Sequence, residues 1–185
     1  MISRMPIPAG THAFGPENST LAVRTGRSGA AAMAGHDLLI DVTSWHATLE
    51  VGEGQTSVTF DADASSLRVR EGTGGMQALG DDDKASIEQT IGEEVLQRQG
   101  IAFRSTAVQP AADGSKISVH GELTLAGNSG PIAFELTVGA DGKLTASTML
   151  KQTDWGIKPY STLFGALKVA DEVEVVLDAA LRQAV

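Results

Sequence analysis

The chain of 185 residues contains no cysteine. Disulfide bonds, thiolate catalysis and cysteine-ligated zinc or iron–sulfur sites are therefore all excluded. The sequence also has no apolar run approaching the ~18–20 residues that span a bilayer. Its first ten residues, MISRMPIPAG, contain two prolines and no apolar stretch of signal-peptide length. From these absences we expect a protein that does not span a membrane and is located in the cytoplasm.

Positive charge and aromatic residues are both scarce. There are 14 Lys and Arg residues against 23 Asp and Glu residues, which gives a formal net charge of −9. A surface of this sign repels phosphate backbones, so we expect no nucleic acid partner. The content of 42% hydrophobic and 20% charged residues is typical of a folded globular chain. Its length predicts an N-terminal arm over residues 1–10 and a single domain over 11–185.

Apolar and polar side chains alternate in about eight segments, as strands with one apolar face do. These segments are 19–24, 38–51, 56–64, 101–108, 115–125, 131–138, 143–150 and 171–179. Within 38–51 the alternation shifts at Ser44–Trp45, which indicates a bulge or a bend. The dipeptides Asp113-Gly114 and Asp141-Gly142 predict tight hairpins between late strands. Antiparallel strands lose their exposed edges most easily by closing, so the sequence predicts an all-β fold, a closed antiparallel eight-stranded β-barrel.

One segment departs from this period. Ile87, Ile91 and Val95 recur four residues apart, three aspartates (Asp81–Asp83) precede them, and Gly100 follows. This pattern predicts one α-helix around residues 83–98, with acidic residues at the positive end of its dipole and a glycine at its end. We expect it to lie over one end or side of the barrel.

Residues that could carry chemistry are few and weakly arranged. Asp61 and Asp63 lie on one face of a strand and could hold a metal ion, although such pairs are usually solvated. The glycine clusters match neither a phosphate-binding loop nor a dinucleotide fingerprint. We therefore predict no metal and no cofactor. One alternative stays open: a hydrolase or isomerase that uses His36 or His120 with a nearby acid.

Several segments, taken in order, resemble a known family. Gly121–Gly127 followed by Pro131 resembles a G-x-L-T-x-x-G hairpin, and Ile101–Thr106 resembles the I-x-F-x-S strand that follows a helix. Thr153–Ile157 resembles a D-[FW]-G-I motif, and Asp171–Val175 resembles the terminal strand. Together they resemble the YceI-like family of lipocalin-like, polyisoprenoid-binding proteins. Two departures are Gly100, where the family usually has proline, and Val23-Arg24-Thr25 in place of Val-Arg-His.

The resemblance implies an extended lipocalin-like barrel that binds a polyisoprenoid or similar amphiphilic lipid in an apolar cavity. Such a protein is a carrier or a sequestering protein and performs no chemistry. The predicted ligand contacts are Phe14, Phe60, Phe103, Phe134, Leu136, Trp155, Ile157, Lys158 and Tyr160.

The late loop, 153–164, is expected at a barrel end, where its aromatic rings suit a mouth that is apolar inside and wet outside. Lys158 is expected there to meet an anionic head group as a point charge. The alternative is that Trp155 plugs the barrel and Lys158 is solvated.

Two further alternatives concern the whole molecule. A solid-cored barrel would act through partner proteins instead of a ligand. An enzyme would need titratable groups that converge in the cavity, whereas a carrier needs an apolar interior. The sequence leaves the oligomeric state open, with a homodimer as one candidate.

Overall fold

Antiparallel strands make up most of the chain over residues 7–28, 36–74, 79–139, 141–162 and 167–181, which the computed structural model describes. Most of the predicted N-terminal arm and the last part of the loop 153–164 lie outside these residues. In chain order the strands are β1 (Gly10–Phe14), β2 (Ser19–Arg24), β3 (Arg27–Ser28), β4 (Asp37–Val42), β5 (Trp45–Gly52), β6 (Gln55–Ala62), β7 (Leu67–Thr73), β8 (Ile101–Pro110), β9 (Lys116–Leu125), β10 (Asn128–Val138), β11 (Lys143–Lys151), β12 (Ser161–Thr162), β13 (Leu167–Val169) and β14 (Glu172–Ala180).

Each of the eight segments with alternating side chains forms a strand or a pair of strands. The segment 38–51 divides into β4 and β5 at the predicted bend, with Thr43 and Ser44 between them. Strands β1 and β7, and the short strands β3, β12 and β13, were not predicted. Strand β7 does alternate, with Leu67 and Val69 buried and Arg68 and Arg70 exposed, but the run is short.

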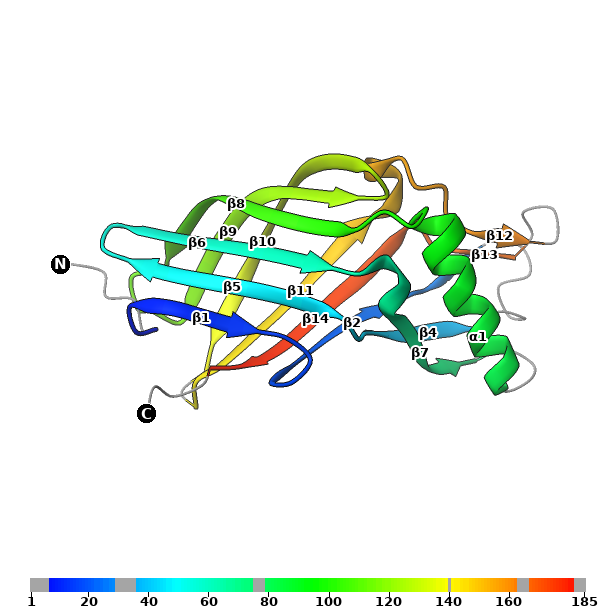
Figure 1. Cartoon of the computed structure of the whole chain (residues 1–185), viewed down its shortest axis with the longest axis horizontal. Helices are drawn as coiled ribbons and strands as arrows, with labels where there is room; N and C mark the ends of the chain where they lie inside the picture. Colours follow the sequence, from blue (N-terminus) through cyan, green and yellow to red (C-terminus); the bar gives the residue numbers. More distant parts are fainter. Residues whose placement is uncertain (1–6, 29–35, 75–78, 140, 163–166, 182–185) are drawn as a thin grey trace.

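The prediction of a closed eight-stranded barrel is wrong in the number of strands and in the closure of the sheet. Over the described residues, eleven strands form one curled, open sheet in the order β1-β5-β6-β8-β9-β10-β11-β14-β2-β4-β7 (Figure 1). The bend explains the open topology, because β4 pairs with β2 and β7 while its continuation β5 pairs with β6 and β1. One bent hairpin thus supplies strands near both ends of the sheet, and β1 and β7 remain edges.

Two backbone hydrogen bonds hold the bent hairpin together. The Thr43 amide donates to the Ser66 carbonyl at 2.9 Å, and the Asp63 amide donates to the Ser44 carbonyl at 3.0 Å. Between β6 and β7 the chain makes a 3-10 turn, η2 (Ala64–Ser66), in which the Asp63 carboxylate accepts from the Ser65 amide. These bonds turn the sheet back toward itself around a long axis.

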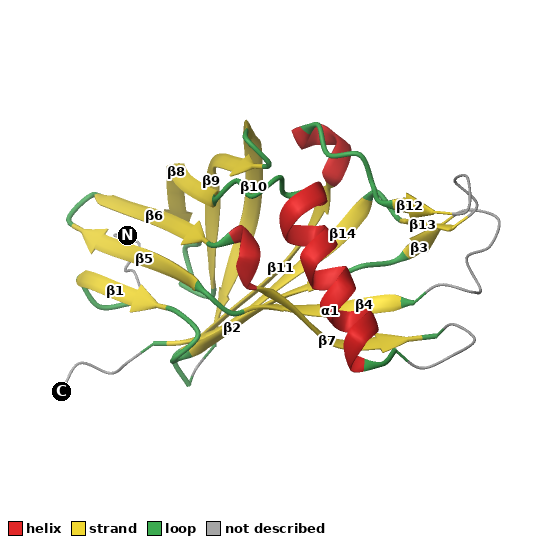
Figure 2. Ribbon diagram, turned by 45° about the vertical axis from the view of Figure 1, so that its right-hand side comes forward, coloured by secondary structure: helices red, strands yellow, loops and turns green. Residues whose placement is uncertain are grey.

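The predicted helix is present with different bounds. Helix α1 (Asp81–Thr90) is followed by a wider π-helical turn, η3 (Ile91–Val95), and Asp83 caps the first turn by accepting from the Gly80 amide. A Cβ on Gly92 would lie 3.3 Å from the Ala64 carbonyl oxygen, so this glycine lets η3 pack closely on η2. The Glu88 carboxylate accepts from the Val69 amide at 2.8 Å, which ties α1 to β7 (Figure 2).

Beside α1 at one end of the molecule, a small sheet in the order β12-β13-β3 extends the structure (Figure 1). The 3-10 turn η4 (Gln152–Trp155) connects β11 to the segment that leads into this sheet. Helix α1 and the small sheet therefore define one end of the curled sheet, and the β5–β6 hairpin defines the other.

Candidate functional site

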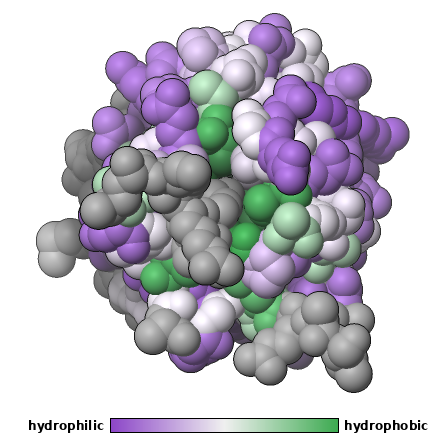
Figure 3. Space-filling view, turned by 90° about the vertical axis from the view of Figure 1, so that its left-hand side faces the viewer, coloured by the Kyte–Doolittle hydropathy of each residue, from purple (hydrophilic) through white to green (hydrophobic). Residues whose placement is uncertain are grey.

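A cavity of about 600 Å³ lies inside the curled sheet. Its wall is formed by the inward-facing side chains of the alternating strands, such as Leu21 and Val23 of β2 and Val173 and Val175 of β14. Viewed from the end away from α1, apolar side chains lie between hydrophilic ones at the surface (Figure 3). The alternation seen in the sequence thus points its apolar face into a hollow interior. This volume is within the range of cavities that bury small-molecule ligands.

Aromatic side chains form part of this wall in two pairs. The rings of Phe103 and Phe134 have centroids 5.5 Å apart and are tilted by 56°, and those of Trp45 and Phe60 are 6.0 Å apart and tilted by 40°. Phe103 lies against Gly121 of β9, where a Cβ would be 2.5 Å from its ring. The glycine therefore sets how deeply the Phe103 ring sits in the wall.

Polar lining residues gather at the end of the cavity next to α1 and the small sheet. Those at this end include Thr25, Arg27, His36, Ser86, Thr90 and Tyr160, and three more polar lining residues, Thr48, Thr148 and Gln152, belong to β5, β11 and η4. The Arg27 Nε donates to Asp37 Oδ1 at 3.0 Å, and the two side chains are 26% and 45% exposed. Tyr160 is 46% exposed, so its ring reaches both the cavity and the solvent. The cavity wall is thus mostly apolar along its length, and polar side chains are concentrated at one end.

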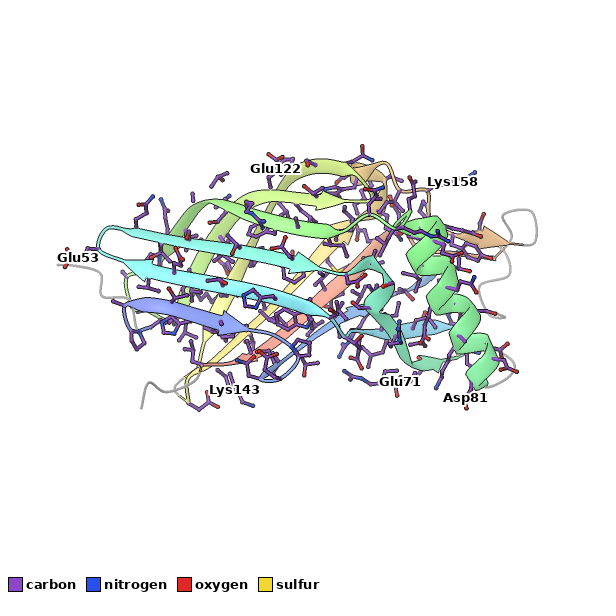
Figure 4. The ribbon with its side chains drawn as sticks, in the orientation of Figure 1. Glu53, Glu71, Asp81, Glu122, Lys143 and Lys158 are labelled. Atoms are coloured by element: carbon purple, nitrogen blue, oxygen red, sulfur yellow. The ribbon has the colours of Figure 1, made fainter. Side chains whose placement is uncertain are left out.

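Seven of the nine predicted ligand contacts line this cavity, namely Phe14, Phe60, Phe103, Phe134, Leu136, Ile157 and Tyr160. The other two, Trp155 and Lys158, lie outside its lining. Lys158 is exposed and lies at the periphery of the molecule (Figure 4). Their role in binding stays a prediction.

Trp155 is buried against β9 and β10 and not in the cavity wall. It belongs to η4, and its Nε1 donates to the Leu123 carbonyl on β9 at 2.8 Å across Gly130 of β10. The Asn128 side-chain amide donates to the Trp155 carbonyl at 2.8 Å. The indole thus fastens η4 to the ends of β9 and β10.

Trp45 was missed as a lining residue. It is 7% exposed at the start of β5, and its indole Nε1 has no hydrogen-bond partner among the described residues. The sequence contained a signal for this inward position. After the shift at Ser44–Trp45, the residues Trp45, Ala47 and Leu49 occupy every second position, and all three line the cavity. A buried indole N–H usually finds an acceptor, so an unsatisfied one in a cavity wall is unusual.

Among the described residues, the groups with a clearly shifted pKa lie at the surface and not in the cavity lining. Hydrogen bonds from Ser65, Ser115 and Thr153 lower the pKa values of Asp63, Asp113 and Asp171, and the bond to Asp41 raises the pKa of Arg70. These carboxylates accept from nearby hydroxyl and amide groups and so stabilise turns.

The candidate catalytic and metal residues do not converge. His120 is exposed on β9, outside the lining, while His36 lies at the polar end of the cavity. Asp61 pairs with Arg104 at 3.3 Å, whereas Asp63 caps η2. Across the ranges that the structure covers, no three His, Asp or Glu side chains gather as a metal-binding group would.

Among these same ranges, no helix has the length and apolar character needed to cross a membrane.

Comparisons with known proteins place this geometry in a family. A family model described as YceI-like domain matches residues 14–181. The structure of Burkholderia cenocepacia BcnA has a TM-score of 0.60 and 17% identity, over 86% of this chain and 94% of that one. The Campylobacter jejuni YCEI protein has a TM-score of 0.54 and 12% identity, over 78% and 85% of the two chains. At these identities the two structures establish the shared fold alone.

A comparison with curated protein sequences gives no match. The family model nevertheless covers nearly all of the barrel, from the last residue of β1 to the residue after β14. The chain therefore belongs to the YceI-like family, which is known for binding hydrophobic ligands.

Proposed function

We propose that this protein binds an amphiphilic lipid, a polyisoprenoid or a similar molecule, in the barrel cavity and acts as a carrier or sequestering protein. The observation that carries the proposal is the cavity of about 600 Å³ with apolar walls. Withdrawing an apolar tail from water into such a cavity yields roughly 25 cal/mol per Å² of apolar surface. Binding of this kind needs a shaped interior and a few polar groups, and no chemistry.

The distribution of polar and apolar side chains along the cavity suggests how an amphiphilic ligand is oriented in it. Polar side chains lie at the end beside α1, including Arg27 and Tyr160, whereas Leu49, Val58 and Leu144 line the cavity with apolar groups farther along the barrel. We place the head group of the amphiphile at the polar end and its tail along the apolar walls. Arg27 is already held by Asp37, which favours a polar head group of low charge. A cytoplasmic location and a homodimer stay predictions.

The alternatives have less support. A solid-cored barrel does not agree with the cavity. An enzyme would need a nucleophile or base near an acid inside the cavity, but His120 faces outward and His36 lies at the polar end. The described titratable groups with shifted pKa values lie outside the lining. We therefore propose binding without catalysis.

The two tryptophans allow a test that locates the ligand. Trp45 lines the cavity and Trp155 does not, so each single Trp→Phe variant leaves one reporter. Titration with farnesol or geranylgeraniol should shift the fluorescence of Trp155→Phe to saturation and leave that of Trp45→Phe unchanged. A competition assay with cis-parinaric acid should give similar affinities for both variants. If neither prenol binds saturably, or if only the Trp155 signal responds, the proposal is overturned.

A further inference from the structure

The wall of the barrel is interrupted between β10 and β11. Strand β10 pairs with β9 from Asn128 to Thr137, and β11 pairs with β14 along its whole length. Between β10 and β11, however, the register contains only Thr137↔Thr145 and Val138↔Leu144. Figure 1 shows the two strands diverging from the turn that joins them. Over most of their described length the facing edges are therefore not hydrogen-bonded to each other.

A surface hollow lies over this interruption. Continuing the observed register would place Ile132 opposite Leu150 and Ala133 opposite Met149. The same residues, with Pro131 and Lys151 beside them, line a hollow of about 260 Å³ together with Asp154, Trp155 and Glu172. We call these six strand residues, Pro131–Ala133 and Met149–Lys151, the β10–β11 window.

Both ends of the window are fixed. At one end is the short ladder at Thr137 and Val138. At the other end Trp155 reaches across Gly130 to the Leu123 carbonyl, and Asn128 donates to the Trp155 carbonyl. The hydrogen bonds of Trp155 thus hold η4 across the top of the gap. The gap between β10 and β11 is therefore held by hydrogen bonds at both ends, unlike the loose end of a strand.

Two side chains of the window also belong to the cavity wall. Ile132 and Leu150 line both the outer hollow and the interior cavity. A path through the window therefore requires these two side chains to change rotamer, a motion that breaks no backbone hydrogen bond. Between the other neighbouring strands of the sheet the ladders are longer, from three to ten residue pairs, so an opening there would separate more paired residues.

The chemistry of the window suits an amphiphile. Met149 is 56% exposed at its edge, and Lys151, Asp154 and Glu172 form a charged rim. Pro131 has no N–H to offer an added strand, and lysine and proline are residues that protect open edges from strand pairing. These features favour an apolar chain crossing the opening over a partner strand docking in it.

We infer that the β10–β11 window is a lateral portal through which the apolar tail of the ligand enters and leaves the cavity, with Ile132 and Leu150 as its gate. This inference rests on the proposed lipid-binding function. It adds the route that the ligand takes, since a tail that passes through the wall need not be threaded lengthwise from the polar end.

Because the chain has no cysteine, two introduced thiols can be linked uniquely. Ala133→Cys with Met149→Cys places exposed thiols on opposite sides of the window, and a short bis-maleimide then links them. Thr137→Cys with Thr145→Cys is the matched control, because these exposed residues lie on the same two strands where the ladder already joins them. The probe is cis-parinaric acid, followed by stopped-flow fluorescence and by equilibrium titration.

Linking the window should slow both association and dissociation about tenfold and leave Kd within twofold, because a blocked path changes rates and not the bound state. Linking the control pair should change neither rate by more than twofold. As a second test without linking, Ile132→Ala should accelerate both rates. Equal rates in linked and unlinked window variants would overturn the portal and leave the proposed function standing. If the unlinked protein does not bind the probe, the proposed function is overturned and the portal with it.

Discussion

Gly121 offers a strict test of how the cavity wall is packed. A Cβ at this position would lie 2.4 Å from the Arg104 carbonyl oxygen and 2.5 Å from the Phe103 ring. The carbonyl belongs to β8, which pairs with Gly121 of β9 opposite Ser105, so it cannot turn aside as a flexible side chain could. Phe103 is 4% exposed and is packed against Phe134. We therefore expect Gly121→Ala to shift both the β8 backbone and the ring.

The magnitude follows from two opposing effects. Overpacking a core costs about 1–3 kcal/mol, and a backbone clash belongs to the upper part of that range. Replacing glycine by alanine in a strand regains about 0.5–1 kcal/mol, because the unfolded chain loses freedom. The net loss in free energy of unfolding should be about 1.5–2 kcal/mol. With a urea m-value of about 2 kcal/mol/M, the unfolding midpoint should fall by about 1 M.

Gly100→Ala is the matched control, because a Cβ there would come no closer than 3.9 Å, to the Ala62 carbonyl oxygen. Its urea midpoint should stay the same or rise slightly. The double variant Gly121→Ala/Phe103→Leu should lose less stability than the sum of its single variants, since leucine removes the ring contact. A Gly121→Ala midpoint equal to that of the unchanged protein would refute this account of the wall.

Three further predictions concern the cavity wall, the stability at acidic pH and the late loop. Phe134→Asp places a charge in the cavity wall and should cost about 2–4 kcal/mol in urea unfolding, whereas Thr137→Asp on the exposed face of β10 should cost little; equal costs would invert the assigned faces. The Thr153 hydroxyl lowers the pKa of Asp171, donating to it at 2.7 Å, so this stabilisation is present above the ordinary aspartate pKa and is lost as the pH falls below about 4. Thr153→Val should therefore make the urea midpoint fall less between pH 6 and pH 2. If the midpoint of the variant falls as much as that of the unchanged protein, the hydrogen bond from Thr153 to Asp171 does not contribute to acid unfolding. Because Lys158 lies outside the cavity lining, Lys158→Glu should change the Kd values of farnesol and farnesyl phosphate equally, within about twofold; a selective loss of the phosphate would place the head group at Lys158.

The sequence alone determined which face of each strand turns inward. Side chains in a strand alternate with period two, so segments such as 131–138 show which face is apolar, because their apolar residues occupy every second position. The bend at Ser44–Trp45 and the helix after Asp81 were likewise local signals, and the structure contains both. Phe60, Phe103, Phe134 and Leu136 line the cavity for the same reason, since an inward face can be found without knowing the neighbouring strand. Ile157 and Tyr160 line it from the loop after η4, where no alternation applies.

Only the tertiary structure decided which strands are neighbours and how far they pair. Asp141-Gly142 predicts that β10 and β11 are joined by a tight turn, but no local signal says that their ladder ends after two residue pairs. The position of Trp155 depends on Gly130 and Leu123, which precede it by 25 and 32 residues in the printed sequence. The opening of the sheet depends in the same way on the bent hairpin, whose two halves pair with different partners. Periodicity fixes the direction of a side chain, whereas pairing between distant strands depends on the packing of the whole sheet.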